Sequence, residues 1–321
     1  MIKHLLRRGS TLFVYFLLFL RYFYLLRCIN KIKVAPNDVC LVLGNGPSLK
    51  DSIEKHMDLF EGKKIICVNQ FNKSEYYERI KPDFYILADP MYWNKPFQKI
   101  RDDLNENHLD QFKPEELEYY QSLKNIVEGT INNIERKTQW PMTLFLPLQS
   151  MLSKELGDLP SKNPYVSICY YNTTPINRGF TALLYFLYRH NLGMPTPMTV
   201  LNAAIFLTLN MGFKKIFLLG ADHTFHEDLT VNEKNMVCTK PLHFYDTEKV
   251  KNLPMFKEQN TGTTFTMHDW WMFLYKMFRS HFYLEAYSKS LNAKIYNASE
   301  RTFLDAYERY FPSSAKDQSE S

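Results

Sequence analysis

The chain lacks the cysteine spacing of a zinc site or of a disulfide framework. Its five cysteines are odd in number, scattered and without a CxxC pair: Cys28, Cys40, Cys67, Cys169 and Cys238. Two of them lie inside strand-like apolar runs. This pattern predicts reduced thiols in a reducing compartment.

Clusters of positive charge are missing as well. The sequence holds 39 Lys and Arg against 34 Asp and Glu, a formal net charge of +5. No run of Lys and Arg is long enough to form a stripe that binds nucleic acid, so we expect no nucleic-acid partner. The modest positive charge is compatible with an acidic or phosphorylated ligand.

No apolar run reaches the length of a membrane-spanning helix. The ten residues from Thr11 to Leu20 are uninterrupted, and the fifteen from Leu12 to Leu26 include Arg21, whereas a span needs about 20 residues. No small-residue cleavage site follows, which argues against a secretory signal. We expect residues 1–33 to form a helix in the bilayer interface, with its arginines reaching anionic headgroups. A buried packing helix and a single span are alternative interpretations.

Strand and helix patterns alternate after this segment. Three continuous apolar runs, "DVCLVLG", "KKIICVNQF" and "KPDFYILADP", are typical of strands covered on both faces, as in a parallel sheet. A buried helix, the strand "KKIFLLG", a long helix from near His268 to about Leu291, the strand "AKIYNAS" and a short helix at "ERTFLDAYERY" follow.

The alternation predicts an α/β fold, with a Rossmann-like, doubly wound and mostly parallel sheet in a single domain at 34–312. Within this domain we expect an insertion at about 91–160 and a lid at about 224–266. We expect residues 313–321 to form a disordered tail.

The first strand ends in a glycine turn, "GNGPS", at Gly44–Ser48. Backbone N–H groups, the serine hydroxyl and the start of a helix together suit a phosphate. The turn is neither the GxxxxGK[ST] of a P-loop nor GxGxxG, because Leu49 stands in place of the third glycine. A tight strand-to-helix turn also needs glycine whatever binds there, so both interpretations stay open.

Two further strand ends carry polar side chains. Asn69 and Gln70 follow the second strand, and their amides suit a base or a ribose, although such a pair commonly caps a strand end. Asp89 ends the third strand, where a carboxylate accepts hydrogen bonds from ribose hydroxyls or holds Mg²⁺. In doubly wound sheets such strand ends meet at one edge, where ligands bind.

Histidines mark two later positions. Gly220 opens a loop that carries Asp222, His223 and His226, which could form a metal site but are more commonly surface residues. His268 stands where a long polar segment meets a helix, and a histidine there can act as a general base near neutral pH. A capping or packing role is the alternative. The aromatic residues beside it are expected in the core: Trp270, Trp271 and Phe273.

The ordered set "GNGPSL", "VNQF", "GFKKIFLLGAD" and a late histidine before a helix resembles the bacterial sialyltransferases of glycosyltransferase family 42. The similarity covers about Val39–Met91 and Thr199–Tyr307. It implies inverting transfer of a sialic-acid-like or related sugar from a CMP-activated donor to a glycan or lipid-linked acceptor in surface polysaccharide synthesis. It also implies that His268 deprotonates the acceptor hydroxyl and that no metal or other cofactor takes part.

The resemblance further implies which residues bind the nucleotide. They lie in the glycine turn, the amide loop and the later strand ends: Gly44, Asn45, Gly46, Ser48, Asn69, Gln70, Asp89, Thr199, Gly220 and Asp222. Asp89 stands where the family has asparagine, and Thr199 matches only loosely, so the donor sugar is open. Together with the N-terminal segment, the resemblance implies a location at the cytoplasmic face of a bacterial inner membrane, peripheral or anchored by that helix.

A second family shares part of this signature. "GNGPSL", "KPDFYILADP" and the "LGAD" strand end also resemble the archaeal 6-hydroxymethylpterin pyrophosphokinases (domain of unknown function 115). That resemblance implies an Mg²⁺–ATP site at Asp89 and Asp222 for diphosphate transfer. A third interpretation is a non-catalytic, membrane-attached nucleotide-binding protein. The N-terminal segment favours the transferase, since surface polysaccharide enzymes act on lipid-linked acceptors.

Overall fold

The computed structural model describes residues 38–110, 114–240, 243–245, 253–254 and 264–310, together with the single residues 29, 32, 34 and 112. Apart from residues 29 and 32, the N-terminal segment expected to associate with a membrane lies outside the described residues. The tail expected at 313–321 lies outside them too.

Eight strands form one sheet in which every neighbouring pair is parallel. Along the sheet they are β11 (Glu308–Arg309), β10 (Lys294–Asn297), β6 (Lys215–Leu219), β1 (Val39–Leu43), β2 (Lys64–Val68), β3 (Phe84–Ile86), β4 (Met142–Pro147) and β5 (Val166–Tyr171). From β1 the chain builds outward to β5 and then returns through β6 on the other side of β1. The strand order therefore reverses between β1 and β6, and such a switch point is where doubly wound sheets bind ligands.

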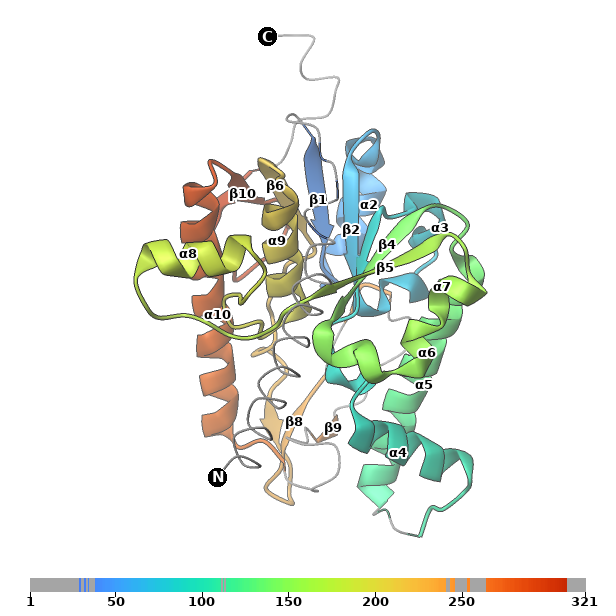
Figure 1. Cartoon of the computed structure of the whole chain (residues 1–321). Helices are drawn as coiled ribbons and strands as arrows, with labels where there is room; N and C mark the ends of the chain where they lie inside the picture. Colours follow the sequence, from blue (N-terminus) through green and yellow to red (C-terminus); the bar gives the residue numbers. More distant parts are fainter. Residues whose placement is uncertain are drawn as a thin grey trace, which may run out of the picture.

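Side chains of β1 alternate between two apolar cores. Leu41 and Leu43 pack on one face of the sheet, whereas Cys40 and Val42 pack on the other. The first core includes residues of α2 (Leu49–Lys55), α3 (Tyr76–Ile80), α4 (Lys95–Asn105), α5 (Pro114–Lys137), α6 (Lys154–Gly157) and α7 (Leu159–Lys162). The second includes residues of α8 (Thr181–Arg189), α9 (Val200–Met211) and α10 (Met267–Ser290), which lie together in Figure 1. Helices thus cover both faces, and the predicted doubly wound α/β fold is confirmed.

Local capping residues begin and end helices on the second face. Thr199 and Asn202 form a capping box at the start of α9, and Gly212 ends it in the left-handed region at φ 100°. A second capping box, formed by Thr266 and Asp269, begins α10. Four short 3-10 helices complete the assignment: η2 (Met57–Phe60), η3 (Asn69–Lys73), η4 (Pro90–Tyr92) and η5 (Leu148–Leu152).

Two expectations differ from the structure. The segment at 91–160 is not wholly an insertion, because Met142–Pro147 pairs with both β3 and β5 inside the main sheet. The prolines at 141 and 147 sit just before this strand and at its last residue, so its interior keeps every backbone donor. The stretch at 300–310 contains no helix, and its last residues form β11 instead.

The segment at 224–266 carries a small antiparallel sheet of its own. Its strands are β7 (Thr230–Val231), β8 (Val237–Thr239) and β9 (Leu253–Pro254). Figure 1 shows β8 and β9 beyond one end of the main sheet. No described helix is long and apolar enough to cross a membrane.

The cysteines differ in part from the expectation of reduced thiols. Cys40, Cys67 and Cys238 are free and buried, and burial raises the pKa of each of these thiols. Cys169 is disulfide-bonded. Among the described residues, three buried thiols therefore occur together with a disulfide-bonded cysteine on β5.

Candidate functional site

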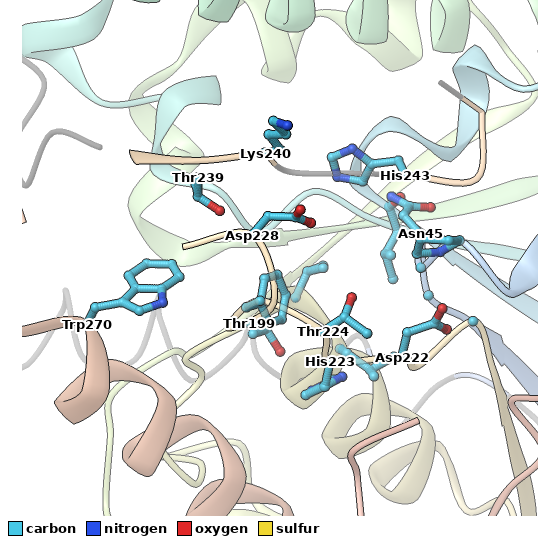
Figure 2. Close-up of a pocket in the computed structure, with 18 residues that line it drawn as sticks. Asn45, Thr199, Asp222, His223, Thr224, Asp228, Thr239, Lys240, His243 and Trp270 are labelled. Carbon is cyan, nitrogen blue, oxygen red and sulfur yellow. The ribbon is translucent and has the colours of Figure 1, made fainter. Parts of the chain in front are cut away.

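A cavity of about 270 Å³ opens at the switch point between β1 and β6. Its floor consists of the turn after β1, the loop after β6 and the first turn of α9, and Thr239, Lys240 and His243 form its roof (Figure 2). Six of the ten predicted nucleotide-binding residues line it: Gly44, Asn45, Gly46, Thr199, Gly220 and Asp222. The other four, which are Ser48, Asn69, Gln70 and Asp89, do not.

The glycines of the floor hold β1 and β6 together. The Gly44 N–H donates to Leu219 O at 2.8 Å, and the Gly46 N–H donates to Gly220 O at 2.9 Å. A Cβ on Gly46 would lie 2.5 Å from Asp222 Oδ1, and a Cβ on Gly44 would overlap the carbonyl of Gly220. The glycine turn is therefore required by the close approach of the two loops, and two of the N–H groups expected to bind phosphate are already used.

Ser48 is also engaged within the protein. Its N–H donates to Asp222 Oδ2 at 2.8 Å and its hydroxyl donates to Asp222 Oδ1 at 2.6 Å. Burial raises the pKa of Asp222, and the two hydrogen bonds from Ser48 oppose this rise. The turn thus faces a carboxylate across the floor, so it does not form the phosphate cradle that the sequence suggested.

Two buried polar atoms on the cavity wall have no partner among the described residues. Asn45 donates its Nδ2 to Val68 O at 3.1 Å, which leaves Asn45 Oδ1 as an unpaired acceptor. Trp270 is 5% exposed, and its Nε1 is an unpaired donor. Its indole stacks on Phe273 at 4.9 Å, so Trp270 is a core residue, as predicted, and also a cavity wall. Trp271, which was also expected in the core, is instead exposed. One donor and one acceptor are therefore available to a ligand.

The roof of the cavity comes from the segment predicted to be a lid. Figure 2 shows Lys240 and His243 on the opposite side of the cavity from Thr224 and His223. Sequence analysis missed Lys240 and His243, because isolated basic residues in a long polar segment carry no periodic signal.

The roof is attached to the floor at its far end. The Phe244 N–H donates to Asn45 O at 3.2 Å, and the Phe244 ring packs on Phe71 at 5.4 Å. The Tyr245 hydroxyl donates to Gln70 Oε1 at 2.9 Å. Gln70, which we expected to contact the nucleotide, therefore holds the roof in place.

A second cavity, of about 430 Å³, lies beside the first and shares Thr199 and Val200 with it. Asp89, Trp93 and Tyr171 are among its other lining residues. The Tyr171 side chain is fully buried, and its hydroxyl has no partner among the described residues. The two cavities therefore meet at the first turn of α9.

Asn69 and Asp89 form a pair at the edge of this second cavity. Asn69 Nδ2 donates to Asp89 Oδ2 at 2.6 Å, and Asn69 Oδ1 accepts from the Ala88 N–H at 3.2 Å. Asn69 adopts a left-handed backbone, at φ 45°, which turns its amide toward β3. Burial raises the pKa of Asp89 to about 6, and nearby His243 acts in the opposite direction. A carboxylate with such a pKa is suited to accept a proton near neutral pH.

His268 lies apart from both cavities. It is exposed in the first turn of α10, next to the capping box, and it lines neither cavity. Its predicted role as the general base thus has no support from its position.

The loop histidines turn toward different neighbours. His223 lines the cavity, and its Nε2 lies 3.0 Å from His281 Nε2, whereas the His226 ring packs on Phe303. Burial lowers the pKa of His223 to about 4, so the ring is neutral. No group of three or more possible metal ligands occurs among the described residues.

A network of buried hydrogen bonds extends from His223 into the second core. His281 Nε2 also meets Asn202 Nδ2 at 3.0 Å, and His281 Nδ1 meets the Tyr307 hydroxyl at 3.0 Å. Asn202 is the residue that caps α9 together with Thr199. This hydrogen-bond network fixes the ring of His223 and the first turn of α9, so the wall shared by the two cavities is rigid.

No protein-family model matches the sequence, and no curated protein is similar to it. Among solved structures, the MAf glycosyltransferase from Magnetospirillum magneticum AMB-1 is similar, with 13% identity and a TM-score of 0.42. The alignment covers 85% of this chain and 33% of that protein, so the chain spans about a third of its length. That name describes the activity of the Magnetospirillum protein. For this chain, a function has to be argued from the geometry of the two cavities.

Proposed function

We propose that the chain is a glycosyltransferase that moves a sugar from a nucleotide-activated donor to an acceptor hydroxyl. The observation that carries this proposal is the pair of adjoining cavities, the first at the switch point and lined by Lys240, the second at the ends of β3, β4 and β5 and lined by Asp89. Transfer between two substrates needs two sites that meet. It also needs a positive group near the departing phosphate and a base near the attacking hydroxyl.

The donor occupies the first cavity in this proposal. Asn45 Oδ1 and Trp270 Nε1 supply the unpaired acceptor and donor that orient the nucleotide. Lys240 on the roof neutralises the charge that develops on the leaving phosphate, a task that a metal ion performs in other transferases. A CMP-linked, sialic-acid-like or related sugar is the donor that the sequence resemblance favours.

The acceptor occupies the second cavity, where Trp93 offers an aromatic face and Tyr171 an unpaired hydroxyl. Asp89 takes the proton from the acceptor hydroxyl, whose oxygen attacks the anomeric carbon. The bond from that carbon to the phosphate oxygen breaks, and its electron pair leaves with the phosphate. Attack from the face opposite the leaving group inverts the anomeric centre. The acceptor class suggested by the sequence is a glycan or a lipid-linked sugar for surface polysaccharide at the inner face of the membrane.

The pyrophosphokinase alternative needs Asp89 and Asp222 to share one Mg²⁺–ATP. Both oxygens of Asp222 already accept from Ser48, and the two carboxylates line different cavities. This arrangement favours the glycosyltransferase over the kinase. The non-catalytic alternative gives no role to the raised pKa of Asp89.

Calorimetric titration with CMP, CDP, UDP and ATP, each with and without Mg²⁺, tests the proposal. We expect CMP to bind without Mg²⁺, and W270F, which removes the indole N–H and makes the ring smaller, to weaken that binding by roughly three- to tenfold. W271F is the matched control, because Trp271 is exposed on the next position of α10. ATP binding that depends on Mg²⁺ would favour the kinase, and no binding of any nucleotide would refute a donor site.

A further inference from the structure

One face of α10 carries large apolar side chains that no described residue covers. Trp271, Met272, Tyr275 and Phe282 are 54%, 44%, 53% and 51% exposed. Their spacing of three, four and seven residues places them on one side of the helix. We call these four residues the aromatic face. Globular proteins rarely expose a contiguous row of such side chains unless it contacts a partner.

A neighbouring helix adds to this exposed surface. Phe180, Leu183 and Phe186, at the start of α8 and within it, are 85%, 54% and 52% exposed. Figure 1 shows α8 crossing α10, and Arg189 Nη2 donates to Ser290 O at 3.2 Å where the two helices meet. A second exposed apolar surface therefore lies on α8, which meets the C-terminal end of α10.

The charges on this surface are mainly positive. Lys276 and Arg279 are exposed between the members of the aromatic face. Arg279 donates to the hydroxyls of Tyr275 and Tyr283 and lies over both rings, so its guanidinium is held at the surface. The acidic Glu285 on the same helix pairs with Lys289 at 3.3 Å.

This combination of chemistry identifies the partner. Tryptophan and tyrosine prefer the headgroup level of a bilayer, and lysine and arginine are attracted to anionic lipids. A second copy of the chain, packed through the same face, would bring Lys276 and Arg279 against their own equivalents, which is unfavourable. We propose that the aromatic face docks on an anionic lipid bilayer.

The position of the aromatic face gives the docking a consequence for the substrate. Trp270 lines the donor cavity, and Trp271, the next residue, belongs to the aromatic face. Docking therefore brings the cavity end of α10 to the headgroup level. If the proposed glycosyltransferase function is correct, on which this step rests, the acceptor is a lipid-linked sugar presented from the same bilayer.

Quenching of tryptophan fluorescence by brominated phosphatidylcholine, in vesicles that also contain phosphatidylglycerol, tests the docking in the full chain. We expect strong quenching in the wild type and a clear loss of quenching in W271F. W140F is the control, because Trp140 is buried beneath the opposite face of the sheet. Quenching should weaken in 0.5 M salt, since the attraction to anionic lipid is screened.

A second variant measures the strength of the contact. F282S should lower the vesicle partition coefficient on the order of tenfold, because one buried aromatic side chain is lost from the bilayer. Equal quenching in the wild type and W271F would overturn the proposal, even if the chain sediments with vesicles, because another segment would then hold it there. Concentration-dependent dimers that F282S abolishes, without quenching, would also overturn it in favour of a second copy. Nucleotide binding by F282S, measured as above, is independent of the docking, so failure of one proposal does not imply failure of the other.

Discussion

Ser48 donates both its backbone N–H and its hydroxyl to the carboxylate of Asp222, which lies 174 positions further along the chain. The two residues are 8% and 3% exposed. They join the turn after the first strand to the loop after β6, beside the first cavity. The contact engages two donors of Ser48 that the sequence suggested for a ligand phosphate.

Removing one of these hydrogen bonds should destabilise the protein. S48A takes away the hydroxyl and leaves a buried carboxylate oxygen without its donor, so we expect the free energy of unfolding to fall by about 1–3 kcal/mol. Urea denaturation measures the change, with S161A as the control, because the Ser161 hydroxyl is exposed and bonds only within its own turn. A double-mutant cycle with D222N should show that the two substitutions are not additive. Additive effects would show that the two residues are not coupled.

The base of the transfer reaction can be assigned by comparing two variants. We expect D89N to lower the rate of sugar transfer by about 10²- to 10⁴-fold, the usual contribution of a general base, and to leave CMP binding intact. H268A should transfer at close to the wild-type rate, because His268 lines neither cavity. The opposite pattern, a slow H268A and an active D89N, would restore the role predicted from the sequence.

The pH dependence of stability reports on the same carboxyl group. The pKa of Asp89 is raised from 3.8 to about 6 in the folded protein, so the folded state favours the protonated form. Its contribution to stability is full below about pH 4 and is lost as the pH rises to about 6. The difference in unfolding free energy between wild type and D89N should therefore change across this window. A constant difference would mean that Asp89 titrates normally.

The rate of transfer should depend on pH in the opposite sense. Asp89 must be ionised to accept a proton, so we expect kcat/KM to rise as the pH increases through about 6. A rate profile that is flat from pH 5 to pH 8 would exclude Asp89 as the base.

The attachment of the roof predicts an effect on affinity. Y245F removes the hydrogen bond to Gln70 and loosens the segment that carries Lys240 and His243. We expect the Kd for CMP to rise by roughly three- to tenfold with little change in thermal stability. Y310F is a suitable control, because Tyr310 is exposed at the far edge of the sheet. Unchanged affinity would show that the roof does not contact the nucleotide.

The sheet was predictable because its strands are continuous apolar runs. Local sequence also marked the ends of α9 and α10, through Thr199, Gly212 and Thr266. The strand Met142–Pro147 was missed, since prolines flank its core and it stands in a polar, irregular region. Only its pairing with both β3 and β5 makes it a central strand. Here the pairing with neighbouring strands determined the structure, although the local sequence did not favour a strand.

The site could be predicted only in part, for a related reason. Six of the ten predicted residues line the first cavity, but a sequence does not reveal whether a donor is already paired with a distant group. Ser48 is paired with Asp222, and Gln70 with Tyr245, so neither is available in the way that its motif suggested. Asp89 gained its altered pKa from burial, a property that only the folded chain has.

The close backbone contacts at Gly44, Gly46 and Gly220 also determine which part of the cavity can change its shape. These backbone hydrogen bonds join the two halves of the sheet at its centre. They should open only when the whole domain unfolds, so their amide hydrogens should be among the slowest to exchange. The floor of the first cavity is therefore rigid. Adaptation to different ligands therefore falls to the roof residues, so changes of specificity in related sequences would arise around Lys240 and His243 and leave the turn after β1 unchanged.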